Sequence, residues 1–226
     1  MWALSQLTLP AAYILAATGV CAAPPPPLVE MEFINTPPIE RHDLSSRELG
    51  AIQGTTTFSH GPKEVFITEG RMISEFAPEY FVSFAAPVDP ATGWYCLSVQ
   101  EIKIKVNYTP TIYLASELQE GTCRYEVTLQ HEARHVNIDI ITYNEFLPVL
   151  RQVVQDTANG IGVIGPLKPE NLIRERDRIV DKLRPPLEAK VMEIGKIFNN
   201  RQQTIDTRQA YLREGALCPN ESVSAP

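Results

Sequence analysis

Strand-like patterns of apolar and polar residues dominate residues 54–116. The clearest lies at residues 101–106 (EIKIKV), where apolar and charged residues alternate as in a strand with one buried and one exposed face. A second apolar run, residues 110–115, follows a short break at residues 107–110, as is typical of an antiparallel hairpin. The pattern predicts a small sheet of about four to six mostly antiparallel strands.

A long helical pattern follows these strands. Thr122 is the expected N-cap, and the helix should run from residue 123 to about residue 144. Apolar residues recur along it at helical spacing: Tyr125, Leu129, Val136, Ile140 and Leu147. We expect Pro148 to break or kink the helix, because its ring clashes with the preceding turn. Residues 160–166 should form an apolar connecting loop. Helices should follow at residues 170–183 and, beyond a break at Pro185 and Pro186, from residue 186 to about residue 200. This order makes the chain an α+β protein with its sheet first and its helices after.

The motif His131-Glu132-Ala133-Arg134-His135 lies within this helical pattern. Side chains four positions apart on a helix lie on one face, with about 5–6 Å between their Cβ atoms, so His131 and His135 can bind the same metal ion. Catalytic zinc sites use such nitrogen ligands and leave one position for water, and a neighbouring carboxylate can take the proton of that water. The motif predicts a Zn²⁺ site with His131 and His135 as ligands and Glu132 as the catalytic base. The alternative is a surface helix with two solvated histidines.

A third protein ligand is not evident from the spacing. Asp139 lies about 12 Å along the helix axis from His131, too far to bind the same ion easily. We expect Asp139 to orient His135 through a hydrogen bond, or else to be a solvated carboxylate. Three carboxylates of the helical half remain candidates for the third ligand: Glu170, Glu175 and Asp206.

Composition and the N-terminal residues indicate export. The chain has 226 residues and a formal net charge of −7, which argues against a nucleic-acid partner. Residues 7–20 are apolar, no charged side chain precedes Glu30, and small residues follow, as in a signal peptide. We expect a signal peptide at residues 1–22 with cleavage after Ala22, a proline-rich spacer at 23–50 and a single domain at 51–226. The mature protein should be periplasmic or secreted, without a stable membrane span.

The sequence alone allows more than one disulfide pairing. Removal of Cys21 with the signal peptide leaves Cys96, Cys123 and Cys218, which can form one internal disulfide. We favour Cys96 with Cys123, and the alternatives are Cys123 with Cys218 or three reduced thiols.

The chain resembles the zincin metallopeptidases in this motif and in the order of its elements: strands come first, then the metal-bearing helix, then a helical second half. Its placement, the signal peptide and the chain length are similar to those of bacterial predicted secreted zinc-dependent proteases. The resemblance covers residues 95–215, and its specific part is the five-residue motif. It implies a zincin-like fold and hydrolysis of a peptide or protein substrate, with zinc on His131 and His135 and Glu132 as general base.

The chain departs from known zincins after His135, because it has neither a Gly-x-x-His continuation nor a downstream Asn-Glu-x-x-x-Asp helix. The alternative hypothesis is therefore an exported binding or envelope-structural protein without catalytic activity, in which the metal site is degenerate or absent.

Overall fold

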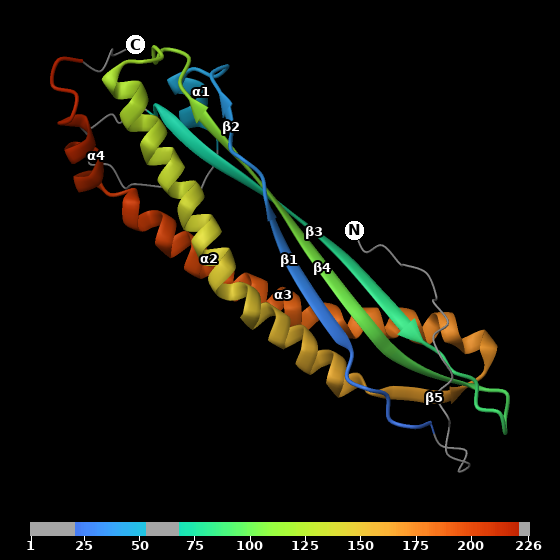
Figure 1. Cartoon of the computed structure of the whole chain (residues 1–226). Coiled ribbons are helices and arrows are strands. Elements are labelled where there is room, and N and C mark those ends of the chain that lie inside the picture. Colours follow the sequence, from blue (N-terminus) through green and yellow to red (C-terminus); the bar gives the residue numbers. More distant parts are fainter. Residues whose placement is uncertain (1–20, 53–67, 222–226) are drawn as a thin grey trace. The chain divides into compact units, whose positions relative to one another are not determined.

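The fold is α+β, and the computed structural model describes residues 21–52 and 68–221 (Figure 1). Most of the predicted signal peptide and the strand-like residues 54–67 lie outside the described residues. The elements are β1 (Leu28–Asn35), β2 (Ile39–Arg41), α1 (Ser46–Ala51), β3 (Gly70–Ala85), β4 (Tyr95–Leu114), α2 (Cys123–Ile161), β5 (Val163–Leu167), a 3-10 turn (Pro169–Asn171), α3 (Leu172–Ile205) and α4 (Arg208–Gly215). Residues 23–50, which we expected to form a proline-rich spacer, contain β1, β2 and most of α1.

The prediction of a small, mostly antiparallel zincin-like sheet is wrong. β4 pairs with each of the other four strands, and β2 runs parallel to it, with Ile39 opposite Thr111 and Arg41 opposite Tyr113. β5, at residues that we expected to form a connecting loop, pairs with β4 in the antiparallel direction.

The hairpin expected at residues 107–110 is also absent, because β4 continues through them as one strand of 20 residues. The alternation of buried residues explains this continuity. Every second residue is buried from Ile102 to Leu114, and the alternation does not shift at residues 107–110. The buried residues are Ile102, Ile104, Val106, Tyr108, Pro110, Ile112 and Leu114. Pro110 is buried in this row, so it does not end the strand.

Prolines also fail to end the helices where the sequence predicts breaks. Pro148 lies inside α2, which continues for 13 residues to Ile161, and Pro185 and Pro186 lie inside α3. Beyond Pro148, Leu150 and Val154 are buried, so packing against neighbouring elements stabilises the helix on that side of the proline. The predicted N-cap is confirmed, because the Thr122 hydroxyl accepts a hydrogen bond from the Tyr125 backbone amide at 3.3 Å.

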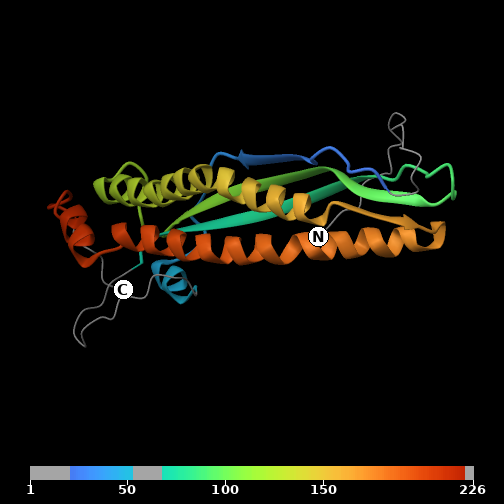
Figure 2. The same ribbon diagram turned by 90° about the horizontal axis from the view of Figure 1, so that it is seen from below.

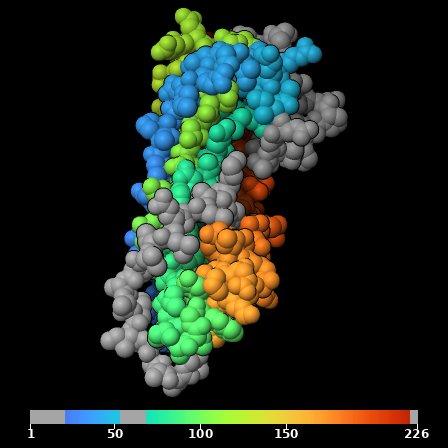
Figure 3. Space-filling model, turned by 90° about the vertical axis from the view of Figure 1, so that its right-hand side faces the viewer, coloured from blue at the N-terminus to red at the C-terminus, as the bar shows by residue number. Residues whose placement is uncertain are grey.

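The described chain divides into two compact units, each built from three segments. Unit 1 comprises residues up to 34, 77–107 and 145–194, and unit 2 comprises 35–76, 108–144 and the residues from 195 onward. In unit 1, β5 pairs with the start of β4, and the Lys168 ammonium lies 5.7 Å from the centre of the Trp94 ring. Figure 3 shows this region in space-filling form, with the turn between β3 and β4 (green) beside β5 and the start of α3 (orange).

In unit 2, the first half of α2 and the last turns of α3 lie side by side (Figure 2). The Arg201 guanidinium donates a hydrogen bond to the Thr142 hydroxyl at 3.1 Å across this helix pair. Phe76 of β3 packs against Tyr143 and Phe198, with ring centres 5.1 and 5.9 Å away. This packing holds the motif-bearing part of α2 against the C-terminal residues of the chain.

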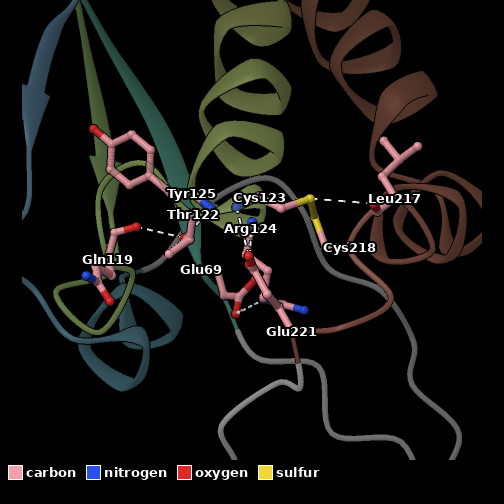
Figure 4. The surroundings of a disulfide bond; sticks show 9 residues. All are labelled: Glu69, Gln119, Thr122, Cys123, Arg124, Tyr125, Leu217, Cys218 and Glu221. Atoms are coloured by element: carbon pink, nitrogen blue, oxygen red, sulfur yellow. Dashed lines mark hydrogen bonds and ion pairs between the residues drawn. A yellow bond between two sulfur atoms is a disulfide. The ribbon is translucent and has the colours of Figure 1, made fainter.

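Two disulfides are present, Cys21–Cys96 in unit 1 and Cys123–Cys218 in unit 2, and no cysteine is free among the described residues. The favoured Cys96–Cys123 pair is therefore wrong, and the alternative Cys123–Cys218 pair is confirmed. Figure 4 shows the second disulfide at the start of α2, where the Glu221 carboxylate accepts hydrogen bonds from the Cys123 and Arg124 backbone amides at 3.0 and 2.9 Å. These contacts fasten the C-terminal segment to the N-terminus of α2.

The two disulfides fit a protein that folds in an oxidising, non-cytoplasmic compartment. None of the helices in the described part of the chain is long and apolar enough to cross a bilayer.

Candidate metal centre

Two elements of unit 2 bring three metal-ligating side chains together. His131 and His135 lie one turn apart on α2, and Asp206 lies between the end of α3 at Ile205 and the start of α4. The Thr207 hydroxyl caps α4 by accepting a hydrogen bond from the Ala210 amide at 3.1 Å, which fixes the chain direction directly after Asp206. Figure 1 shows α4 (red) beside the first half of α2.

The three inward-facing donor atoms form a nearly equilateral triangle. Asp206 Oδ1 lies 3.0 Å from both His131 Nε2 and His135 Nε2, and the two nitrogens are 3.2 Å apart. Ligands about 2.0–2.1 Å from one ion are separated by about 3.3–3.4 Å in a tetrahedron and by about 2.8–3.0 Å in an octahedron. The observed edges lie between these values. The triangle therefore fits a first-row transition-metal ion without rearrangement, whereas Ca²⁺ requires six to eight oxygen ligands.

The hydrogen bonds of the outer imidazole nitrogens define both tautomers. His131 Nδ1 lies 3.0 Å from Glu214 Oε2 and 3.4 Å from Arg134 Nη2. The carboxylate, which only accepts, is the nearer partner, so we assign the proton to Nδ1. His135 Nδ1 contacts Gln202 Oε1. The Gln202 amide nitrogen donates to the His135 carbonyl at 3.1 Å and to Asp139 Oδ1 at 2.6 Å, so its oxygen must face the ring. In the neutral form, each histidine therefore directs an Nε2 lone pair into the triangle.

Three electron-rich atoms thus face one another in a dry environment. The His131 and Asp206 side chains are 4% exposed, and that of His135 is 10% exposed. The Tyr211 hydroxyl donates one hydrogen bond to Asp206 Oδ1 at 2.8 Å. A cation at the centre of the triangle would remove the remaining repulsion, which makes the donor set one that fits a metal ion.

Protonation of the imidazoles can partly replace such a cation. Burial disfavours the charged rings, but the hydrogen bonds to Asp206 and the charge of Glu132 outweigh it and raise the pKa of both His131 and His135. Burial also opposes ionisation of Asp206, but hydrogen bonds from the two histidines hold its pKa well below the usual range.

Glu132 is buried beside this triangle, against the first residues of β3. Burial raises the pKa of its carboxyl group, although the charges of His135 and His131 and a hydrogen bond from the Met72 backbone amide favour the ionised form. A Cβ atom at Gly70 would lie 2.8 Å from Glu132 Oε1 and 2.5 Å from Thr128 Cγ2. The glycine therefore leaves the space that the carboxylate occupies. A carboxyl group with a raised pKa is suited to take up and return a proton.

Asp139 does not contact His135 directly, so the expected orienting hydrogen bond is absent. Its carboxylate accepts hydrogen bonds from Tyr108 Oη at 3.1 Å and from Gln202, and Gln202 in turn contacts both the ring and the carbonyl of His135. The orienting residue is thus Gln202, with Asp139 behind it.

Asp206 is one of the three carboxylates that the sequence offers as a third ligand, and the structure places it beside His131 and His135. Glu170 and Glu175 are not part of this group. The sequence alone does not identify Gln202, Tyr211 or Glu214, because no local spacing connects these residues to the motif on α2. Among the described residues, His131, His135 and Asp206 are the His, Cys, Asp and Glu side chains whose arrangement could hold a metal ion.

In comparisons with protein-family models, curated proteins and solved structures, nothing matches this chain. The functional argument therefore depends on the geometry of the site and on its five-residue motif.

Proposed function

We propose that this chain is an exported zinc-dependent peptidase in which His131, His135 and Asp206 bind zinc and Glu132 is the general base. One observation carries the proposal: three buried donor atoms lie within 3.2 Å of one another beside a buried glutamate with a raised pKa. Hydrolytic zinc sites need this combination of three protein ligands, a fourth position for water and an adjacent base.

The surrounding residues are suited to hold the ligands in place. When bound, zinc would lower the pKa of a water molecule towards about 7 and polarise the substrate carbonyl group. Glu214 and Gln202 accept hydrogen bonds from the Nδ1–H groups of His131 and His135, which keeps both Nε2 atoms available as ligands. Glu132 takes the proton of the attacking water and returns it to the leaving amine, a role for which a carboxyl group of raised pKa is suited.

Tyr211 supplies a further polar group at the site. Its hydroxyl lies 2.8 Å from Asp206 Oδ1 and 3.4 Å from His131 Nε2, so it borders the triangle. Its single O–H is directed at Asp206 Oδ1; turned towards a bound substrate instead, it would donate a hydrogen bond to the negative charge that develops on the carbonyl oxygen. Burial and the charge of Asp206 raise the Tyr211 pKa, which keeps the phenol protonated and able to donate.

Two histidines and one carboxylate are also the ligands of non-haem iron(II) oxygenases. Glu132, adjacent in sequence to His131 and buried at the site, favours a hydrolytic centre instead, because it supplies the base that such a centre requires. Metal analysis of the purified protein separates the two assignments, since iron in place of zinc would contradict the peptidase proposal.

The proposal is tested with the disulfide-bonded protein and two variants. Wild-type protein should bind zinc and cleave a fluorogenic casein substrate. Glu132→Gln should retain zinc and lose cleavage by at least about 10²-fold, the lower end for loss of a general base. His131→Ala should lose both. Zinc binding without hydrolysis of any peptide or protein in the wild type, and no effect of Glu132→Gln, would instead support the non-catalytic binding protein.

A further inference from the structure

The residues on both sides of the cleavage site expected after Ala22 are integral to unit 1. Cys21 forms a disulfide with Cys96 of β4, and Val29 of β1 is buried. The Gln155 side chain of α2 donates a hydrogen bond to the Pro27 carbonyl at 3.0 Å. The chain is thus held at residues 21, 27 and 29 by a covalent bond, a hydrogen bond and apolar burial.

Unit 1 also provides space for the Cys21 sulfur. A Cβ atom at Gly165 of β5 would lie 2.9 Å from Cys21 Sγ, 2.7 Å from the Tyr95 carbonyl oxygen and 3.2 Å from Cys96 Cα. Any side chain at position 165 would therefore collide with the disulfide and with the backbone of β4. Cys96 itself is 3% exposed. The packing of β4 and β5 thus accommodates a disulfide at this position.

Signal cleavage after Ala22 is incompatible with this arrangement. It would remove Cys21 and leave Cys96 as a buried thiol without its partner, beside the space at Gly165. Cleavage must therefore occur before Cys21 if the exported chain contains the disulfide.

The sequence offers one suitable bond in that stretch. Signal cleavage sites carry small residues at the first and third positions before the cut. Ala17-Thr18-Gly19 satisfies this pattern, whereas cleavage after Ala16, Ala17, Thr18 or Val20 places a large or branched residue at one of the two positions. The remaining apolar run, residues 7–17, is within the length of about 7–15 residues that such segments have.

We propose that the signal peptide is cleaved at the Gly19–Val20 bond, so that the exported chain begins at Val20 and retains Cys21 for its disulfide with Cys96. Water adds across the peptide bond, which leaves a carboxylate on Gly19 and an amine on Val20. The two cysteine thiols then lose two protons and two electrons to a disulfide-containing oxidant of the export compartment, which is reduced to its dithiol. This inference depends on export and is independent of the zinc site.

The test is to express the whole chain in a host that exports it and to determine the mature N-terminus by mass spectrometry. Peptide mapping without reduction then identifies the disulfides. We expect Val20 as the first residue and a linked peptide pair that contains Cys21 and Cys96. A mature chain that begins at Ala23 with Cys96 open to alkylation would overturn the inference, as would an exported chain that keeps residues 1–19.

Two matched variants locate the cleaved bond without dependence on folding, because each places the same charged residue before one of the two possible cuts. Gly19→Arg should abolish or displace the cleavage, whereas Ala22→Arg should leave Val20 as the first residue. The reverse result, with normal cleavage in Gly19→Arg and failure in Ala22→Arg, would show that the cut follows Ala22.

Discussion

His131 Nδ1 donates a hydrogen bond to Glu214 Oε2 at 3.0 Å, although the two residues are 83 positions apart. Arg134, one turn beyond His131 on α2, also contacts this carboxylate. Glu214 thus joins α4 to the histidine that faces it and defines which imidazole nitrogen is free to bind a metal.

Replacement of Glu214 should weaken zinc binding without removing a ligand. We expect Glu214→Gln to lower the zinc affinity about 10-fold and Glu214→Ala about 100-fold, because His131 loses the acceptor that orients it. Competition with a chromophoric chelator measures both values. Glu170→Gln and Glu175→Gln are the matched controls, and we expect wild-type affinity from each; a wild-type affinity for Glu214→Ala would contradict this role.

Gln202 should contribute to stability as well as to metal binding. In Gln202→Ala, His135 loses an acceptor and the buried Asp139 carboxylate loses a donor, which should cost about 1–3 kcal/mol of the free energy of unfolding. Urea denaturation of the metal-free protein measures the loss. The neighbouring Gln203 is exposed, so Gln203→Ala is the control and should change stability by less than about 0.5 kcal/mol. Equal effects of the two substitutions would disprove the assignment.

Gly70 should tolerate no side chain. Gly70→Ala places a methyl group against Thr128 and Glu132 and should destabilise the protein by about 1–3 kcal/mol while displacing the proposed base. Gly195, inside α3, has open space where an added Cβ atom would lie, with no atom of another element within 4 Å, so Gly195→Ala should stabilise the helix by up to about 1 kcal/mol. Thermal unfolding distinguishes these opposite signs, and a neutral Gly70→Ala with unchanged hydrolysis would argue against the close contact.

Metal-free and zinc-loaded protein should respond to pH in opposite ways. The raised pKa values of His131 and His135 stabilise the metal-free fold below the unfolded histidine value of about 6.5, and this contribution is lost as the pH rises through the folded values. The raised pKa of Glu132 acts with the same sign. Zinc requires unprotonated imidazoles, so its affinity should rise over the same pH range.

The melting temperature between pH 6 and 9, measured with chelator and with excess zinc, tests this difference. As the pH rises, we expect the melting temperature of the metal-free protein to fall and the increase in melting temperature caused by zinc to become larger. A metal-free protein that becomes more stable towards pH 9 would contradict the raised histidine pKa values.

The Cys123–Cys218 disulfide should be needed for the full metal affinity. It joins the start of the histidine-bearing helix to the segment just after Glu214 (Figure 4). The double variant Cys123→Ser/Cys218→Ser should lose about 2–5 kcal/mol of stability and bind zinc more weakly, because Asp206 and Glu214 are then held by non-covalent contacts alone. Calorimetric zinc titration below the melting temperature separates the two effects. Undiminished affinity in the double variant would show that packing suffices.

The part of the site on a single helix could be predicted from the sequence, because the spacing of His131 and His135 determines their common face. The third member of the group could not be chosen, because Asp206 lies 71 positions beyond His135 and reaches it through the packing of α3 and α4 on α2. Gln202 and Glu214 were missed for the same reason. Their roles arise from tertiary contacts, to which a single sequence gives no local signal.

Errors in the fold came from residues whose local preference is overridden by packing. Pro110 suggested a turn, yet the apolar alternation around it continues, and this longer pattern identifies the strand more reliably than the proline does. Pro148 suggested the end of a helix, but Leu150 and Val154 pack beyond it. The disulfide pairing was misjudged because Cys21 was assigned to the cleaved signal peptide.

The zinc content of purified, disulfide-bonded protein tests the central claim most directly. Elemental mass spectrometry after zinc reconstitution and desalting should find about one zinc per chain in the wild type and a large loss in Asp206→Ala, since three protein ligands define the site. Absence of zinc from the wild type, or full retention in Asp206→Ala, would contradict the claim that His131, His135 and Asp206 form a metal centre.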